Sequence, residues 1–175
     1  MSQFIIQGGK LLSGEILVNG AKNHAVKMLP ASLLFQEPVT LHRVPQVEDV
    51  QRLRELLGAI GYTMEEKKPC TLHITPISRI TATELPRSIA ERIRTSVLFV
   101  GPLLARTGRV KFPHPGGCVI GRRPIDIYLE GWRAMGARIR ENTTGYELSA
   151  RELHGIDFTF RSISHTATEG LMLTA

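Results

Sequence analysis

The chain has 175 residues and a mass of 19.4 kDa; 42% of its residues are hydrophobic and 22% are charged. This composition is typical of a soluble globular domain and excludes a disordered, collagen-like or membrane-spanning chain. The net charge of +6 and the pI of about 9.7 indicate an anionic partner without identifying it.

The sequence shows neither an export signal nor a membrane segment. No apolar run approaches the ~18 residues that a spanning helix needs, and the first ten residues lack a charged region followed by an apolar core. The two cysteines, Cys70 and Cys118, are too few for a disulfide framework. We therefore expect a cytoplasmic protein with no membrane partner.

The apolar pattern predicts helices and strands in a definite order. In the first half it predicts strands at 4–6 and 14–18, a helix at 23–34, a strand at 39–41, a helix at 47–60, and strands at 62–65 and 71–75. In the second half it predicts a helix at 89–104, a strand at 109–112, a Pro- and Gly-rich loop at 113–124, a helix at 125–135, strands at 138–140 and 146–149, and a third helix after Thr166.

The matching order of the two halves indicates an internal repeat. The interval from Lys22 to Pro30 equals that from Arg94 to Pro102, with an offset of 72 residues, and another 72 residues lead to Thr166. Chance similarity between helices is the alternative. The repeat predicts an α/β (α+β) fold with two βαβαββ-like units of about 75 residues and the start of a third.

The helix ends suggest where the second unit is longer. The sequence Leu-Gly-Ala at 57–59 resembles Met-Gly-Ala at 135–137 with an offset of 78, so six residues are added in the second unit. We expect them in the loop 113–124. The apolar, helix-like residues 171–175 end without a capping signal, so we also expect the sequence to be incomplete.

Lys22 and Arg94 take equivalent positions at the start of predicted helices. A helix start offers free N–H groups and partial positive charge, so it attracts anions and disfavours a cation unless an anion binds. We expect both side chains to converge on an anionic ligand; for each, a solvated surface residue is the alternative. Asn23 either adds an amide to the same site or caps the helix.

The loop 113–124 has the most informative sequence. Its Pro and Gly residues permit an irregular, hinge-like path, and Cys118 lies in it shortly before Arg122 and Arg123. Positive charge favours a thiolate, so Cys118 is a candidate nucleophile or acid; an inert, buried cysteine is the alternative. Cys70, between a proline and a strand, is interpreted as structural.

Two further segments carry polar groups suited to a nucleotide or a diphosphate. Pro124 and Asp126 open the helix at 125–135, where Asp126 is either a favourable helix charge or an acceptor for a ligand's base or sugar. Before the third helix come hydroxyl and imidazole groups that suit phosphate, with helix capping as the alternative. They belong to Ser162, Ser164, His165 and Thr166.

The sequence gives no support for a metal ion or an organic cofactor. Its six histidines are scattered, and it contains no HExxH, Cys-x-x-Cys, Walker or GxGxxG motif. Nucleic acid is also excluded as a partner, because aromatic residues make up only 6% and no basic stripe is interleaved with them.

Five motifs resemble those of the UDP-N-acetylglucosamine 1-carboxyvinyltransferases, the enolpyruvyl transferases that commit UDP-N-acetylglucosamine to peptidoglycan synthesis. In chain order they are NGAKN at 19–23, GPLLAR at 101–106, PGGCVIG at 115–121, RPIDI at 123–127 and SHTATE at 164–169. The cysteine loop followed by Arg-Pro-apolar-Asp is the most specific, and it separates this family from the sister 3-phosphoshikimate 1-carboxyvinyltransferases.

The resemblance implies an inside-out α/β barrel of repeated βαβαββ units. It implies transfer of the enolpyruvyl group of phosphoenolpyruvate to the 3′-hydroxyl of UDP-N-acetylglucosamine, with release of phosphate and no cofactor. It further implies a part in cell wall biogenesis, cell shape and cell division, and inhibition by fosfomycin.

The resemblance also implies roles for individual residues. Cys118 would be the general acid that protonates the enolpyruvyl methylene carbon, and the thiol that fosfomycin alkylates. Phosphoenolpyruvate would bind to Lys22, Asn23 and Arg123. UDP-N-acetylglucosamine would bind to Arg94, Arg123, Pro124, Ile125, Asp126, Ile127, Ser162, Ile163, Ser164 and His165.

Members of the family are much longer than this chain, so the resemblance implies an N-terminal portion that lacks the C-terminal half of the enzyme. Residues 1–21 would be the first strands of a largely missing domain, and 22–175 an incomplete enolpyruvyl transferase domain. We expect this chain alone to be inactive and marginally folded. The alternatives are a non-catalytic UDP-sugar-binding module and the sister enzyme. His24, Lys27 and Gly170 depart from the residues usual in the family.

Overall fold

The computed structural model describes residues 3–116 and 125–175, and its two halves share one order of elements. The first half contains α1 (Lys22–Ala31), the 3₁₀-helix η1 (Ser32–Leu34), β1 (Val39–Leu41), α2 (Glu48–Ile60), β2 (Thr63–Lys68) and β3 (Thr71–Thr75). The second contains α3 (Arg87–Ala90), the 3₁₀-helix η2 (Arg94–Phe99), α4 (Val100–Thr107), β4 (Arg109–Pro113), α5 (Asp126–Ala134), β5 (Arg138–Asn142) and β6 (Gly145–Ser149). A last helix, α6 (His165–Met172), follows.

Each half forms a three-stranded antiparallel sheet with the same topology. The strand orders are β1-β3-β2 and β4-β6-β5, so the second strand of each hairpin is central. Leu41 lies opposite Leu72 in the first sheet, and Phe112 lies opposite Tyr146 in the second. The shared topology confirms the predicted repeat.

The second half also contains a trace of the strand that opens a βαβαββ unit. Glu84 forms an isolated parallel bridge with Lys111 of β4. The N–H of Leu85 donates to the carbonyl of Lys111 at 2.9 Å, and the N–H of Lys111 donates to the carbonyl of Thr83 at 2.8 Å. Parallel pairing across a helical connection is the pattern that this unit requires.

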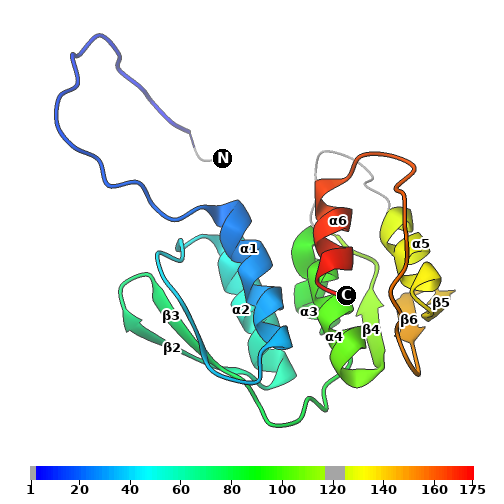
Figure 1. The fold of residues 1–175 in the computed structure, drawn as a ribbon. Coiled ribbons are helices and arrows are strands. Elements are labelled where there is room, and N and C mark those ends of the chain that lie inside the picture. The colour runs from blue at the N-terminus through cyan, green and yellow to red at the C-terminus, as the bar shows by residue number, and fades with distance from the viewer. Residues whose placement is uncertain (1–2, 117–124) are drawn as a thin grey trace.

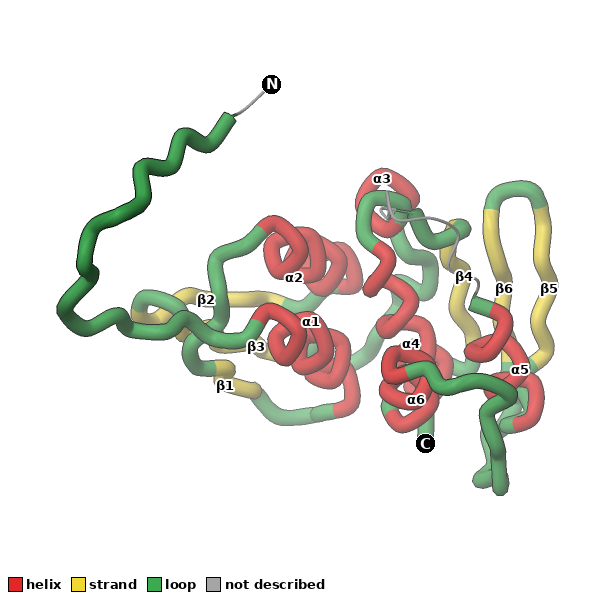
Figure 2. The backbone as a smooth tube through the Cα atoms, turned by 90° about the horizontal axis from the view of Figure 1, so that it is seen from above, coloured by secondary structure: helices red, strands yellow, loops and turns green. Residues whose placement is uncertain are grey.

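The helices lie inside and the sheets outside. Figure 1 shows α1 and α2 against one face of the first sheet, and Figure 2 shows α4 and α6 between this helix pair and the second sheet. The largest fully buried side chains of the single hydrophobic core include Trp132, Phe99, Leu29, Leu53 and Leu103. This arrangement agrees with the expected inside-out α/β architecture.

The helix ends correct the predicted offset between the halves. Gly61 ends α2 with φ 108°, and Gly136 follows α5 with φ 101°, a left-handed conformation that glycine tolerates. The N–H of Gly61 bonds to the carbonyl of Gly58, and that of Gly136 bonds to the carbonyl of Arg133. The equivalent residues are therefore 75 apart, not 78. The match between 57–59 and 135–137 is therefore wrong by three residues. The segment 114–125 before α5 is nevertheless six residues longer than the segment 42–47 before α2, so the expected insertion in this loop is confirmed.

The continuous helix predicted at 89–104 is also wrong, because the chain there is divided into α3, η2 and α4. Pro102 has no N–H to donate to the carbonyl of Leu98, so a regular α-helix cannot run through this point with all its hydrogen bonds. The chain is accordingly 3₁₀ up to Phe99. Pro30, its counterpart in the first half, likewise lies beside a change from α to 3₁₀ at Ser32.

The strands predicted at 4–6 and 14–18 are absent, and residues 3–21 run as an extended segment away from the helices (Figure 1). Their apolar side chains are exposed, from 77% for Val18 to 99% for Leu11. A strand needs a neighbour for its backbone hydrogen bonds. None of the described segments pairs with residues 3–21, so their alternating pattern produces no sheet.

Candidate functional site

Three helices begin at positions that the repeat makes equivalent. Lys22 is the first residue of α1, Arg94 is the first of η2, and Thr166 is the second of α6. Helix α1 packs against η2, and η2 packs against α6. In Figure 1, α1, the α3–α4 segment and α6 all begin at the upper end of the molecule. The structure therefore gathers the three predicted helix starts on one side.

Two of these helix starts are not capped by a side chain. The N-cap residues of α1 and η2 are Ala21 and Ile93, and neither forms a capping hydrogen bond. Their first backbone N–H groups thus lack the intrahelical acceptors that later turns have. Asn23 does not cap α1, so the capping alternative for this residue is not realised.

Lys22 forms an ion pair with Asp49 in the first turn of α2. The Lys22 Nζ atom lies 2.6 Å from the Asp49 Oδ2 atom, and the two side chains are 50% and 43% exposed. The pair orients Lys22 while leaving it open to solvent. In the sequence, Asp49 is only one of two acids in the first turn of a helix. Its contact with Lys22 depends on how α1 and α2 pack.

Tyr128 connects the other two helix starts. Burial raises the pKa of the Tyr128 phenol, whereas a hydrogen bond with Thr166 and the positive charge of Arg94 lower it. The negative charge of Glu169 adds to the rise. Groups from η2, α5 and α6 therefore surround one hydroxyl. The sequence analysis missed Tyr128, since within α5 it has only the signature of a core residue.

A cavity of about 410 Å³ lies at the start of α6. It is lined by Phe160, Ser162, Ile163, Ser164, His165, Thr168 and Glu169. The structure thus brings together the four residues predicted for this segment, Ser162 to His165. The capping alternative is realised as well, because the Ser164 hydroxyl accepts a hydrogen bond from the N–H of Ala167 at 3.2 Å.

Arg161 joins this segment to the start of α5. Its guanidinium lies 3.4 Å from the carboxylate of Asp126 and 3.2 Å from that of Glu130. The two predicted nucleotide-binding segments are therefore neighbours. The side chain of Ile125 is only 4% exposed and Ile127 packs against the core, so both offer a ligand their main chain more readily than their side chains.

Three predicted site residues, Cys118, Arg123 and Pro124, lie outside the described residues. The chain is placed on both sides of them. Gly116 approaches α3 so closely that an added Cβ would lie 1.8 Å from the carbonyl oxygen of Glu91. Ile125 is buried directly before α5. The described chain therefore stops at Gly116, beside α3, and resumes at Ile125, directly before α5.

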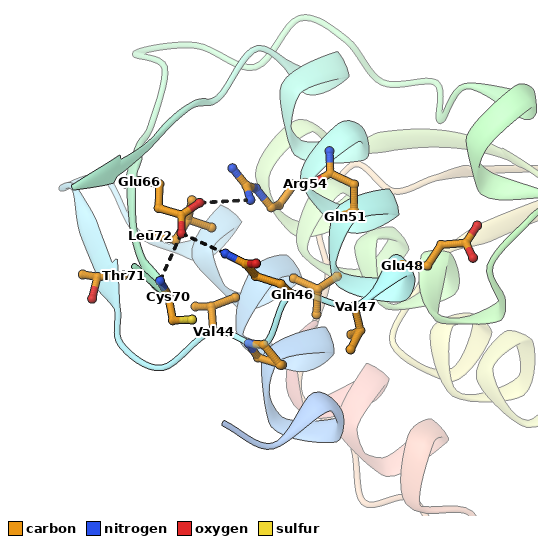
Figure 3. Close-up of a pocket in the computed structure, with 12 residues that line it drawn as sticks. Val44, Gln46, Val47, Glu48, Gln51, Arg54, Glu66, Cys70, Thr71 and Leu72 are labelled. Carbon is orange, nitrogen blue, oxygen red and sulfur yellow. Dashed lines mark hydrogen bonds and ion pairs between the residues drawn. The ribbon is translucent and has the colours of Figure 1, made fainter. Parts of the chain in front are cut away.

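A second cavity, of about 360 Å³, lies between α2 and the turn that joins β2 to β3 (Figure 3). The Glu66 carboxylate accepts hydrogen bonds from the N–H of Cys70 at 3.0 Å and the amide of Gln46 at 3.4 Å, and it lies 3.9 Å from Arg54. The cavity contains none of the predicted site residues. The carbonyl of Cys70 accepts from the N–H of Val44 at 2.8 Å, which agrees with a structural role for this residue.

The described part of the chain contains no group of three His, Cys, Asp or Glu side chains suited to a metal ion. In the same part, no helix has the length and hydropathy needed to cross a bilayer.

Comparison with known proteins identifies the family. Residues 6–175 match the family described as EPSP synthase (3-phosphoshikimate 1-carboxyvinyltransferase). The chain belongs to this family. Two UDP-N-acetylglucosamine 1-carboxyvinyltransferases, from Acidiphilium cryptum (strain JF-5) and Solibacter usitatus (strain Ellin6076), are 43% and 42% identical to it over its whole length. The chain spans 42% of the length of each of these relatives.

Solved structures show the same fold. The enolpyruvyl transferase NikO from Streptomyces tendae superposes with a TM-score of 0.76 at 22% identity, over 95% of this chain and 39% of its own. EPSP synthase from Acinetobacter baumannii superposes with a TM-score of 0.70 at 17% identity, over 92% of this chain and 37% of its own. The fold class and family expected from the motifs are thus confirmed.

Proposed function

We propose that the chain is part of a UDP-N-acetylglucosamine enolpyruvyl transferase. The supporting observation is its identity of 40–43%, over its full length, to relatives named for this reaction. In the reaction, a new bond joins the sugar 3′-oxygen to C2 of phosphoenolpyruvate, the bond from C2 to the phosphate oxygen breaks, and phosphate leaves. The hydroxyl proton would pass to a base, which we place in the part of the enzyme beyond this chain.

The helix starts would bind the anionic groups of phosphoenolpyruvate. Lys22 brings an ammonium group that Asp49 orients, and Asn23 adds an exposed amide on the next residue. Arg123, from the loop before α5, would contribute a guanidinium able to hold a carboxylate or a phosphate with two hydrogen bonds. Clustered cations lower the energy of a transition state in which negative charge shifts towards the leaving phosphate.

Cys118 would act on the reacting carbons. A thiol placed over C3 of phosphoenolpyruvate can protonate the methylene carbon, which makes C2 electrophilic towards the sugar oxygen. Loss of a proton from the resulting methyl group, together with departure of phosphate, restores the double bond. The same thiol is the proposed target of fosfomycin, whose epoxide it would open.

The cavity at the start of α6 would hold UDP-N-acetylglucosamine. Ser162, Ile163, Ser164 and His165 line it, and Arg161 ties it to Asp126 at the start of α5. Arg94, Arg123, Pro124, Ile125 and Ile127 complete the proposed set. Hydroxyl groups and main-chain N–H groups can bind the diphosphate, and the Asp126 carboxylate can accept a hydrogen bond from the base or the ribose.

The proposal extends to the rest of the enzyme. Residues 1–21 would contribute strands to a second domain, and residues 22–175 would form part of the first. The enzyme would act in the cytoplasm, in cell wall biogenesis and hence in cell shape and division. Because the chain spans 42% of its relatives, we propose that it has no turnover by itself.

Fosfomycin labelling tests the proposed site. We expect mass spectrometry of the intact chain and its peptides to find one adduct, on Cys118, and none on Cys70. Cys118→Ser should abolish the adduct and Cys70→Ser should leave it. Adducts at equal rates on both cysteines would contradict a specific site at Cys118.

Calorimetry distinguishes the alternative functions. UDP-N-acetylglucosamine should bind, and shikimate 3-phosphate should not; the opposite result would favour the sister enzyme. Binding of the UDP-sugar without any thiol labelling would favour a non-catalytic binding module. If this chain alone released phosphate when both substrates were present, the proposed need for the rest of the enzyme would be overturned.

A further inference from the structure

Lys27 of α1 forms an ion pair with Glu169 of α6. The Lys27 Nζ atom lies 2.9 Å from the Glu169 Oε1 atom, and the side chains are only 30% and 31% exposed. Helix α1 belongs to the first repeat and α6 opens the third. The pair therefore connects two units that are not consecutive in the sequence.

The rest of α6 packs on the second repeat. Gly170 faces the ring of Tyr128, Leu171 faces Gly131 of α5, and the hydroxyl of Thr174 receives a hydrogen bond from Trp132. These contacts hold the second half of α6 and the residue Thr174 beyond it against α5. The first turn of α6 is also held to α5, by the hydrogen bond of Thr166 with Tyr128. The ion pair with Lys27 adds a contact with α1.

Both members of the pair lie one helical turn further along their helices than the residues of the proposed site. Residues four apart share a helix face, so Lys27 is beneath Asn23 on α1, and Glu169 is beneath His165 on α6. Glu169 also lines the cavity that contains Ser162 to His165. A change in the separation of Lys27 and Glu169 would therefore change the separation of the two walls above them.

Partial burial makes the loss of one partner more costly than it is in a surface ion pair. The Glu169 Oε2 atom is buried and has no hydrogen-bond partner among the described residues. Lys27 is the cation that contacts this carboxylate at 2.9 Å. Loss of one partner would leave a poorly solvated charge on the other. Exposed pairs, by contrast, contribute little because solvent screens them.

We propose that Lys27 and Glu169 are a positioning pair, which fixes the start of α6 relative to α1 and so sets the distance between the Lys22–Asn23 wall and the Ser164–His165 wall of the site. The effect on ligand binding rests on the proposed function. The effect on the helix separation does not.

The helix separation can be measured directly. Nitroxide labels on His24→Cys and His165→Cys, in a chain with Cys70→Ala and Cys118→Ala, report the distance between the two helix starts by electron paramagnetic resonance. We expect the double variant Lys27→Met/Glu169→Gln, which strands no charge, to lengthen or broaden this distance. The reversed pair Lys27→Glu/Glu169→Lys should restore it. An unchanged distance in the double variant would overturn the proposal.

A matched control separates positioning from general loss of an ion pair. Lys111→Met breaks the exposed pair of Lys111 with Glu147, whose atoms are 3.5 Å apart within the second sheet, and should leave the label distance unchanged. In the chain with native cysteines, the affinity for UDP-N-acetylglucosamine should fall about tenfold in Lys27→Met/Glu169→Gln and recover in the reversed pair.

The two measurements separate the two proposals. If the parent chain does not bind UDP-N-acetylglucosamine, the proposed sugar site fails while the label distance still decides the positioning pair. Weaker binding with an unchanged label distance would mean that the charges act on the ligand themselves, and it would overturn the positioning role.

Discussion

The indole N–H of Trp132 donates a hydrogen bond to the hydroxyl of Thr174 at 2.9 Å, and both residues are buried. The same hydroxyl donates to the carbonyl of Gly170 at 2.8 Å. One side chain close to the end of the described chain therefore satisfies a buried donor of the second repeat and a carbonyl of α6. This small network attaches the third repeat to the second.

Thr174→Val tests the network. Valine has the same shape but leaves the indole N–H without a partner, so we expect the free energy of unfolding to fall by about 1–3 kcal/mol. Urea denaturation followed by tryptophan fluorescence measures this, because Trp132 is the single tryptophan of the chain. Thr174→Ser keeps the hydroxyl and should retain most of the stability. A loss in Thr174→Ser with none in Thr174→Val would show that the methyl group matters and the hydrogen bond does not.

Alanine substitutions of three glycines test the corrected repeat register. Gly61→Ala and Gly136→Ala force a side chain into a left-handed conformation, and the new Cβ would lie 3.0 Å from Ile77 and 2.8 Å from His154. We expect each to cost about 1–2 kcal/mol of unfolding free energy. Gly58 lies inside α2 with its Cβ position open, so Gly58→Ala should stabilise by about 0.5–1 kcal/mol. A cost for Gly58→Ala like that of Gly136→Ala would restore the rejected match between these two residues.

The tyrosines predict an unusual alkaline titration. Burial raises the pKa of all three, Tyr62, Tyr128 and Tyr146, and raises that of Tyr146 to about 12 with a further contribution from its hydrogen bond to Glu141. We therefore expect less phenolate absorbance at about pH 10.5 than three model tyrosines would give, because a model tyrosine is mostly ionised at that pH. Full ionisation in the native state at that pH would contradict the burial of these rings.

The same shift makes stability depend on pH. The folded state holds the Tyr146 proton more tightly than the unfolded state. The contribution of Tyr146 to stability is therefore constant below about pH 10 and is lost as the pH rises towards 12. Tyr146→Phe should flatten this part of the profile in denaturation experiments. An unchanged slope in Tyr146→Phe would assign the effect to other groups.

Cys70 offers a test of backbone strain. Its φ of 59° lies in the left-handed region, where a side chain is unfavourable. Cys70→Gly should therefore leave the turn intact and raise the free energy of unfolding by about 1 kcal/mol. Thr71→Gly, on the adjacent extended residue of β3, should instead lower it. A loss of stability in Cys70→Gly would mean that the packing of the thiol outweighs the strain.

The sequence predicted those elements whose signals are local. Helix α2 has acids in its first turn and a glycine at its end, and its apolar residues recur at helical spacing, so its bounds were predicted to within a residue. The hairpin strands were predicted for the same reason. The division at 87–107 was not, because α- and 3₁₀-helices bury similar faces and differ mainly in which carbonyl each N–H selects.

The candidate site was predictable only in part. Lys22, Arg94 and Ser164 were found because a helix start carries a recognisable pattern. Their partners Asp49 and Tyr128 lie on other elements and resemble an ordinary helix charge and a core residue, so only packing reveals them. The strands expected at 4–6 and 14–18 failed for the converse reason, since alternation is local but pairing is not.

The repeat also has an evolutionary consequence. The two copies differ most where the sheet leads into the next helix: the connection covers residues 42–47 in the first copy and 114–125 in the second. Duplication of a self-consistent unit would have left one copy free to acquire new side chains in this segment while its core stayed under the original constraints. Reactivity and stability can then evolve independently. Substitutions in one connection could alter the chemistry while the residues of the core, and hence the fold, stay the same.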